Sequence, residues 1–113
     1  MNADELLIDR YYLNRGEVFV MTRGVLADIL DCGGEYNFEP IPLTHEWLHD
    51  FGFVSQDMNG GTSEWFIPKM RLFFSITEVN GEFCFNHKVE IASVHHLQNM
   101  FFDHTFAYLI KLT

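Results

Sequence analysis

Residues 38–53, with the sequence FEPIPLTHEWLHDFGF, carry the strongest local structural signals in this chain. Pro40 and Pro42 lack backbone N–H donors and push the residues before them out of the helical region. The stretch must therefore begin extended, as an edge strand or a loop. Thr44 then caps a short helix over residues 45–51, which the following glycine ends. The stretch predicts an extended segment followed directly by two turns of helix.

The same helix contains HEWLH at residues 45–49, which matches the zinc-protease pattern of two histidines one turn apart with a glutamate general base. His45 and His49 would lie together on the face opposite the apolar stripe and point to solvent. A metal-dependent hydrolase using His45, Glu46 and His49 is one hypothesis. Because so short a helix is a poor platform for such an enzyme, we instead expect a protein with no catalytic residues, metal or cofactor, beyond incidental metal binding by this pair.

Turn signals divide the rest of the chain into short strands. Asn-Gly-Gly at residues 59–61 and Asn-Gly at residues 80–81 each predict a β-hairpin, and a glycine-containing loop at residues 14–16 predicts a third. The predicted strands cover residues 10–13, 17–22, 53–55, 64–67, 70–79, 83–85 and 89–91.

Two further segments have helical spacing. Residues 25–31 carry an apolar stripe, but nearby glycines leave room for only two turns, so their structure is ambiguous. Ser93 is predicted to cap a C-terminal helix, because apolar residues recur behind it at helical spacing. This helix either stops near Asp103 or continues to Ile110.

These elements predict an α+β fold in which a curved antiparallel sheet packs against the C-terminal helix, with the short helix 45–51 on an edge. The 113 residues suit one domain over 1–113, in which residues 1–9 form a mobile or loosely docked tail. No apolar run is long enough for a membrane span, and the acidic start lacks the features of a signal peptide. Cys32 and Cys84 do not suggest a disulfide framework, so we expect a soluble cytoplasmic protein with reduced thiols.

The charge is unevenly distributed along the sequence. The chain carries a net charge of −9, and residues 1–60 hold 11 acids against three arginines, whereas residues 61–113 hold five acids against four bases. Such a field repels nucleic acid phosphates and attracts basic protein surfaces. We therefore expect no direct nucleic-acid binding and no membrane binding.

Other candidate sites are weaker. His96 and His104 are eight residues apart and could share a helix face with His95 nearby, but a polar helix face with one buried histidine explains them as well. The sequence has no phosphate-binding glycine loop and no nucleophile elbow. Some of the adjacent phenylalanines must face outward, and an exposed aromatic patch would be an interface.

Two separated segments resemble one protein family. PIPLTHEWLHDFGF at residues 40–53 and VHHLQNMFF at residues 94–102 resemble the PIPLTxEWLxxFGF and VHxLQNxxF segments of small proteins from phages and prophage-like elements of Bacteroidota. The resemblance covers about residues 14–104. That pattern usually has glutamate at the position of His45, which would make the zinc-protease match an accident of one substitution. The chain departs from the pattern after Phe102, and the resemblance carries no activity over to any residue.

Together these observations predict a non-enzymatic acidic phage or mobile-element protein, acting in the cytoplasm of a bacterial host. It would bind and inhibit a host nucleic-acid-handling defence protein with a basic surface, such as an RNA-guided CRISPR nuclease, in the manner of an anti-CRISPR. An alternative is a self-assembling module that forms homo-oligomers through Phe101, Phe102, Phe106 and Tyr108. The predicted partner-binding residues are Glu17, Asp28, Asp31, Glu35, Glu39, Asp50 and Asp57.

Overall fold

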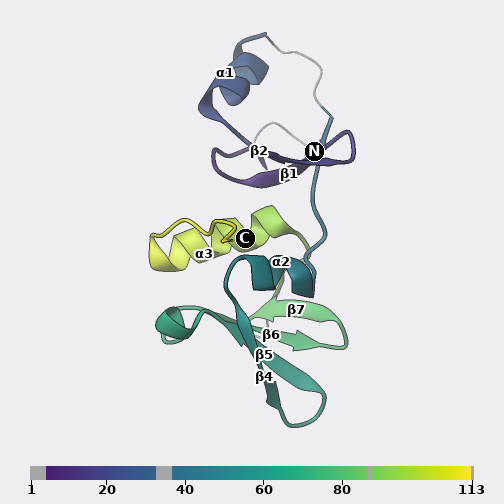
Figure 1. Ribbon diagram of the computed structural model, residues 1–113, viewed down its shortest axis with the longest axis vertical. Helices are drawn as coiled ribbons and strands as arrows, with labels where there is room; N and C mark the ends of the chain where they lie inside the picture. Colours follow the sequence, from purple (N-terminus) through teal and green to yellow (C-terminus); the bar gives the residue numbers. More distant parts are fainter. Residues whose placement is uncertain (1–4, 33–36, 87, 113) are drawn as a thin grey trace. The chain divides into compact units, whose positions relative to one another are not determined.

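The computed structural model describes residues 5–32, 37–86 and 88–112, and the chain forms two compact units, residues 1–41 and 42–113. The sequence pattern predicts one domain, whereas the backbone contacts divide the chain between Ile41 and Pro42. Each unit combines an antiparallel sheet with helix (Figure 1). The α+β class predicted from the sequence is therefore confirmed.

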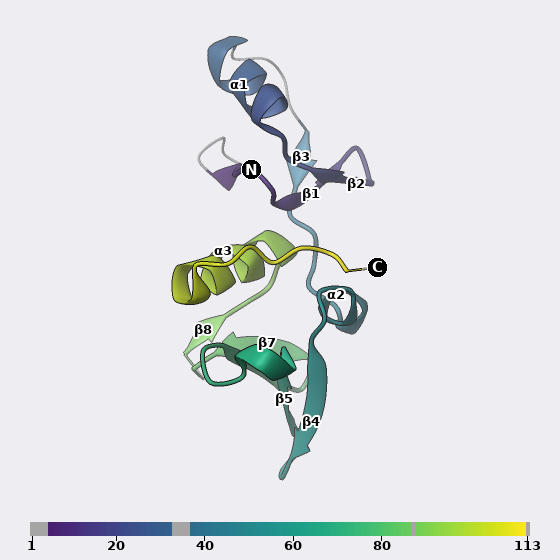
Figure 2. The same cartoon turned by 60° about the vertical axis from the view of Figure 1, so that its left-hand side comes forward.

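The first unit is a three-stranded antiparallel sheet with one helix. Strands β1 (Tyr11–Asn14), β2 (Glu17–Val20) and β3 (Phe38–Glu39) are arranged in the order β2-β1-β3 (Figure 2). Helix α1 (Arg23–Cys32) connects β2 to the segment that leads into β3. The hairpin between β1 and β2 is the one predicted from the sequence, and β3 is the extended start of the proline-containing stretch.

The β1–β2 turn is tighter than the sequence analysis predicts. Asn14 stays in β1 and pairs with Glu17, so that only Arg15 and Gly16 form the loop. Both have positive φ angles, 53° and 82°. Two successive positive φ angles are typical of the type I′ turn, whose twist matches that of the flanking strands.

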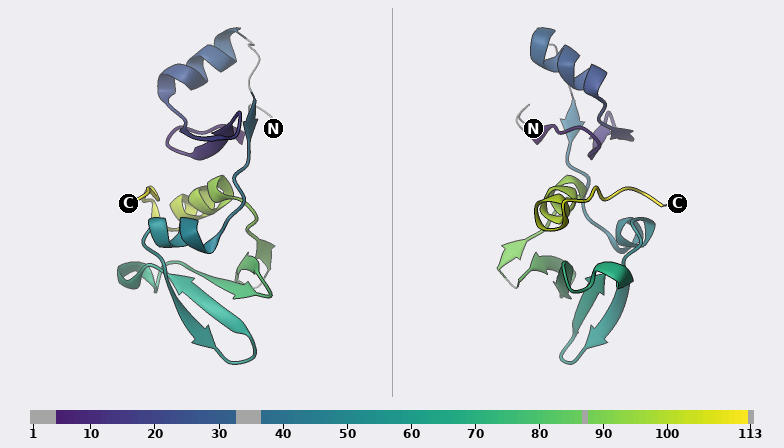
Figure 3. Two further views of the ribbon diagram at one scale, coloured as in Figure 1. Left: turned by 45° about the vertical axis from the view of Figure 1, so that its right-hand side comes forward. Right: turned by 90° about the vertical axis from the view of Figure 1, so that its left-hand side faces the viewer.

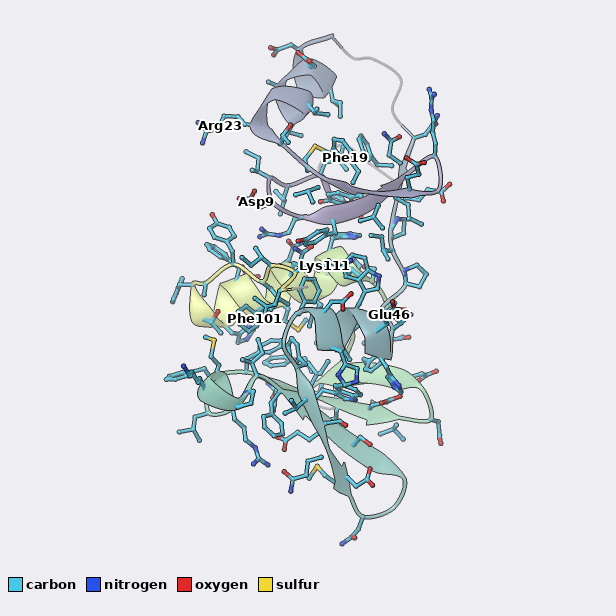
Figure 4. All side chains as sticks on the ribbon, in the orientation of Figure 1. Asp9, Phe19, Arg23, Glu46, Phe101 and Lys111 are labelled. Carbon is cyan, nitrogen blue, oxygen red and sulfur yellow. The ribbon has the colours of Figure 1, made fainter. Side chains whose placement is uncertain are left out.

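Helix α1 resolves the ambiguity of residues 25–31. It is ten residues long and begins before Gly24, because the Thr22 hydroxyl accepts a hydrogen bond from the Val25 N–H at 3.2 Å and caps the first turn. Its apolar stripe packs against a buried cluster from the sheet and the N-terminal segment. In this packing Val25, Leu26, Ile29 and Phe19 lie against Leu6, Tyr12, Met21 and Phe38 (Figure 4 labels Phe19 beneath the helix).

Residues 5–8 are tied to this unit. Leu6 is 2% exposed and belongs to the core. The buried Tyr12 hydroxyl donates to the Glu5 carbonyl at 2.7 Å and accepts from the Leu7 N–H at 2.9 Å. The predicted tail is thus docked where it is described, and residues 1–4 lie outside the described residues.

The second unit contains a five-stranded antiparallel sheet in the order β4-β5-β6-β7-β8. Both glycine turns form hairpins as predicted, and Asn80 and Gly81 have the two positive φ angles of a type I′ turn, 54° and 83°. The strands are β4 (Val54–Met58), β5 (Thr62–Phe66), β6 (Ser75–Val79), β7 (Glu82–Phe85) and β8 (Val89–Glu90).

The predicted strand over residues 70–79 is wrong in its first half. Pro68 opens a 3₁₀ helix, η2 (Pro68–Met70), and the Phe73 and Phe74 N–H groups donate to the Met70 carbonyl at 2.9 and 3.0 Å. Proline is favoured at the start of a helical turn, since its missing N–H has no partner there anyway. The chain therefore turns before the strand begins.

Two helices cover one face of this sheet. Helices α2 (His45–Asp50) and α3 (Val94–Thr105) lie on the same side of it (Figures 1 and 3). Phe101 projects from α3 into the space above the sheet, where its ring centroid lies 5.2 Å from that of Phe74 (Figure 4). Helix α2 was predicted on an edge, but it lies over the face, since His45 contacts the ring of Trp65 in β5.

Both helices start as predicted and end at defined residues. The Thr44 hydroxyl caps α2 by accepting from the Trp47 N–H at 3.3 Å. Ser93 occupies the N-cap position of α3, but its hydroxyl makes no capping hydrogen bond and lies 3.5 Å from His95 Nδ1. Helix α3 ends at Thr105, between the two predicted end points, because Phe106 adopts a left-handed conformation with φ of 59°. No helix in the described part of the chain is long and apolar enough to cross a lipid bilayer.

The segment after α3 has no regular structure but is hydrogen-bonded to both helices. The Leu109 carbonyl accepts from Gln98 Nε2 at 3.0 Å, and the Leu112 N–H donates to the Asp50 carbonyl at 2.7 Å. Lys111 lies over the Trp47 ring, 4.7 Å from its centroid. Residues 109–112 therefore link α2 to α3 within this unit.

The buried Tyr12 hydroxyl makes the stability of the fold depend on pH in the alkaline range. Burial raises the pKa of its hydroxyl above the ordinary value of 10.0, so the folded protein disfavours the ionised form. This stabilising contribution is complete below about pH 10 and is lost as the pH rises towards the folded-state pKa. Tyr12→Phe should lower the free energy of unfolding by about 1–3 kcal/mol near pH 8, because it removes the hydrogen bonds of the hydroxyl with the Glu5 carbonyl and the Leu7 N–H. Urea denaturation near pH 8 and pH 11 should show a smaller alkaline loss in the variant, and equal losses would contradict this account.

Candidate functional site

Helix α1 brings together two of the predicted partner-binding residues. Asp28 and Asp31 are three residues apart, which places them side by side on one face of a helix. The apolar stripe of α1 faces the core, and both aspartates are exposed. Neither carboxylate has a hydrogen-bond or ion-pair partner in the part of the chain that the structure describes. They form a small negative surface at the C-terminal half of the helix.

The position of these acids works against the stability of the helix. The carbonyl end of a helix carries a partial negative charge and favours cations. Helix α1 has no acidic residue in its first turn and no basic residue in its last turn. Asp31, in the last turn, therefore adds to the negative potential of the helix end instead of neutralising it, and Asp28 lies one turn before it, so the helix dipole does not explain their placement.

Glu17 and Glu39 are separated by the pleat of the sheet. Glu17 pairs with Asn14, which lies on the same side of β1 as the buried Tyr12 beneath α1. Glu39 pairs with Leu13, which points to the other side. Residues directly opposite one another in an antiparallel pair share a face, so these two glutamates project from opposite faces.

The remaining predicted residues lie elsewhere. Asp50 is in α2 of the second unit, and its Oδ2 lies 3.5 Å from Lys111 Nζ. Asp57 is in β4, where its Oδ1 accepts from the Ser63 hydroxyl at 3.3 Å. Glu35 lies outside the described residues. Of the seven predicted residues, the structure thus places Asp28 and Asp31 side by side.

The uneven charge along the sequence does not follow the two units. Residues 1–41 hold eight acids and three arginines, and residues 42–113 hold eight acids and four bases. The net charges are −5 and −4, so both units are acidic and the smaller one is more densely charged. The negative field expected from the sequence is therefore a property of each unit, and within α1 the two acids lie together in its C-terminal half.

The HEWLH segment forms a polar cluster that the sequence analysis missed. His45 Nε2 lies 2.7 and 2.9 Å from the two carboxylate oxygens of Glu78 in β6. The indole N–H of Trp65, a residue only 3% exposed, donates to Glu78 Oε1 at 2.9 Å. His49 packs edge-on against the same indole ring, with the centroids 5.2 Å apart. The two histidines are exposed as predicted, but they flank Trp65 instead of pointing freely to solvent.

One sequence signal could have revealed this cluster. Ile76 and Glu78 alternate in β6, so they project from the same side of the sheet, and Ile76 is buried under the helices. A glutamate at such a position needs a hydrogen-bond partner, because a buried carboxylate without one is costly. An indole donor at position 65 and an imidazole at position 45 supply it.

The cluster does not assemble a metal site. Within residues 5–32, 37–86 and 88–112, neither His45 nor His49 belongs to a group of three possible ligands with donor atoms close enough to hold an ion. His45 Nε2, the nitrogen that could coordinate beside Glu78, is already hydrogen-bonded to it. The contacts support a structural role for His45 and His49. They supply no third ligand for the metal ion that the hydrolase hypothesis requires.

The remaining histidines and aromatics divide between core and surface. His95 is buried, whereas His96 and His104 are exposed and His104 Nδ1 lies 2.9 Å from the Met100 carbonyl. Phe101, named in the self-assembly alternative, is 2% exposed and belongs to the core. Phe102 stacks on the exposed Tyr108 at a centroid distance of 4.9 Å, and Phe106 is 82% exposed.

Comparison with known proteins identifies no relative. No protein-family model, no curated protein and no solved structure matches this chain.

The Glu78 cluster should be important for stability. Glu78→Ala leaves the buried Trp65 N–H without its acceptor and should lower the free energy of unfolding by about 1–3 kcal/mol. Glu78→Gln keeps an amide oxygen that can accept this bond and should lose less. Urea denaturation followed by tryptophan fluorescence measures both effects, with Glu82→Ala on the exposed start of β7 as the control. If Glu78→Ala and Glu82→Ala have equal stabilities, the cluster does not hold the unit together.

Proposed function

We propose that this chain is a non-enzymatic binding protein that docks the acidic end of α1 onto a basic surface of a host nucleic-acid-handling protein and inhibits it. The observation that carries this proposal is the pair of exposed carboxylates of Asp28 and Asp31 in the C-terminal half of the helix, which have no partner among the residues that the structure describes. An RNA-guided nuclease is the specific target class that we propose.

The electrostatics of α1 favour an external cationic partner. An acid near the C-terminus of a helix costs about 0.3–1 kcal/mol of stability through its interaction with the helix dipole. The side chain of an arginine or lysine from a partner would relieve this repulsion as it pairs with Asp28 or Asp31. A cationic partner would therefore gain binding energy at the place where the acids of the free protein are repelled by the helix end.

The net charge of the protein narrows the partner class. Nucleic-acid channels are lined with arginine and lysine, and their field steers acidic proteins towards them. Both units of this chain are negative, so the whole molecule is attracted to such a channel while nucleic acid itself is repelled. An acidic protein seated there competes with the phosphate backbone, and the resemblance to phage proteins supports a host defence enzyme as the target.

Charge reversal on α1 tests the proposal. Asp28→Lys with Asp31→Lys should weaken binding to the target by at least about tenfold, because two attractive contacts become repulsive. The assay is cleavage of target DNA by a panel of purified RNA-guided nucleases in the presence of each protein variant. Wild-type inhibition should fall as salt is raised, since surface charges are screened.

The control for this test changes the net charge equally at another place. Glu82→Lys with Asp103→Lys alters two exposed acids of the second unit that are outside the predicted set. This control should inhibit nearly as well as the wild type if the α1 surface is the binding site. Equal losses of inhibition in both double variants would show that the effect comes from the net charge and not from the α1 surface. Inhibition that survives reversal on α1, or an absence of inhibition across the panel, would refute the proposal.

A further inference from the structure

The two edges of the five-stranded sheet differ in how they end. One edge is β8, a strand of two residues. The other is β4, whose five residues pair one-to-one with β5 without a bulge, from Val54 opposite Phe66 to Met58 opposite Thr62. All five residues of β4 are exposed. Figure 3 shows β4 as the outer strand of a long hairpin at the end of the sheet.

In the part of the chain that the structure describes, strand β4 has one acid and no bulge to protect its edge. Exposed edge strands offer unpaired N–H and C=O groups to other chains, and natural proteins blunt them with lysine, proline, bulges or short strands. The sequence of β4, VSQDM, contains neither lysine nor proline. Its one charged residue, Asp57, is hydrogen-bonded back to Ser63 of β5. The opposite edge, β8, is protected because it is short. Strand β4 is therefore the edge that is more accessible for pairing with another chain.

We propose that β4 pairs with β4 of a second copy of this chain, antiparallel and around a two-fold axis through Gln56. In this register Val54 lies opposite Met58 of the second copy, Ser55 opposite Asp57, and Gln56 opposite Gln56. Every cross-strand pair is then complementary: two apolar pairs, two hydroxyl–carboxylate pairs and one amide pair. The result is a continuous sheet of two copies.

The strand sequence selects this register over its neighbours. A two-fold axis perpendicular to the sheet keeps each face on its own side, so it must pass through a residue and not between two. An axis through Asp57 would place two carboxylates directly opposite each other. An axis through Ser55 would leave Met58 without a partner. Only the axis through Gln56 pairs all five residues and joins the exposed side chains of Val54 and Met58 across the boundary.

Substitutions at the axis test the pairing. Gln56→Lys and Gln56→Glu each place like charges opposite each other in a dimer and should raise its dissociation constant several-fold at low salt. An equimolar mixture of the two variants should dimerise again, because lysine then faces glutamate. Sedimentation equilibrium measures the masses, which should be twice the 13.2 kDa of one chain for the wild type and the mixture.

Ser55→Lys is the matched control, because it adds the same charge one residue away but faces Asp57 of the second copy. It should dimerise at least as well as the wild type. A monomeric wild type across the accessible concentrations would overturn the proposal, as would equal weakening by Gln56→Lys and Ser55→Lys or a failure of the mixture to associate. This inference is independent of the proposed target, because the charge reversals on α1 leave β4 unchanged.

Discussion

The Glu78 carboxylate is the contact on which the second unit depends. Its side chain is 14% exposed and receives bonds from Trp65 in the neighbouring strand and from His45 in α2. A carboxylate held in that position is costly without hydrogen-bond donors, so it fixes the orientation of both partners. It therefore ties α2 to the sheet, and this explains why a segment that resembles a zinc-protease motif has its first histidine in a structural bond.

That tie determines which surfaces remain available for function. With α2 and α3 covering one face of the sheet, the sheet itself offers its open face and the β4 edge to other molecules, and the helices and the segment after α3 offer their exposed residues. In the first unit, α1 covers one sheet face and leaves its own acidic side outward. The contacts that stabilise each unit thus lie inside it, whereas Asp28 and Asp31 have no partner among the described residues and the outer side of β4 is exposed.

Local signals predicted the local structure well. The two glycine turns formed the expected hairpins, and Thr44 capped a short helix, because turn and cap geometry depend on a few adjacent residues. The strand predicted from residue 70 failed because Pro68 favours a helical turn that alternation does not reveal. The partnership of Glu78 with His45 joins residues 33 apart, and the separation of the chain at residue 41 rests on contacts between distant segments. No local pattern carries that information.

The acidic residues show that the sequence alone did not define the candidate site either. Glu17 and Glu39 belong to one small sheet, yet their registers send them to opposite faces, so net charge along the sequence does not define a patch. Helix periodicity is the exception, because it alone brings Asp28 and Asp31 together. The two proposed surfaces then lie in different units: the target site on α1 and the self-pairing edge on β4. A dimer through β4 carries two copies of α1, and it would gain avidity for any target assembly that offers two basic sites within reach.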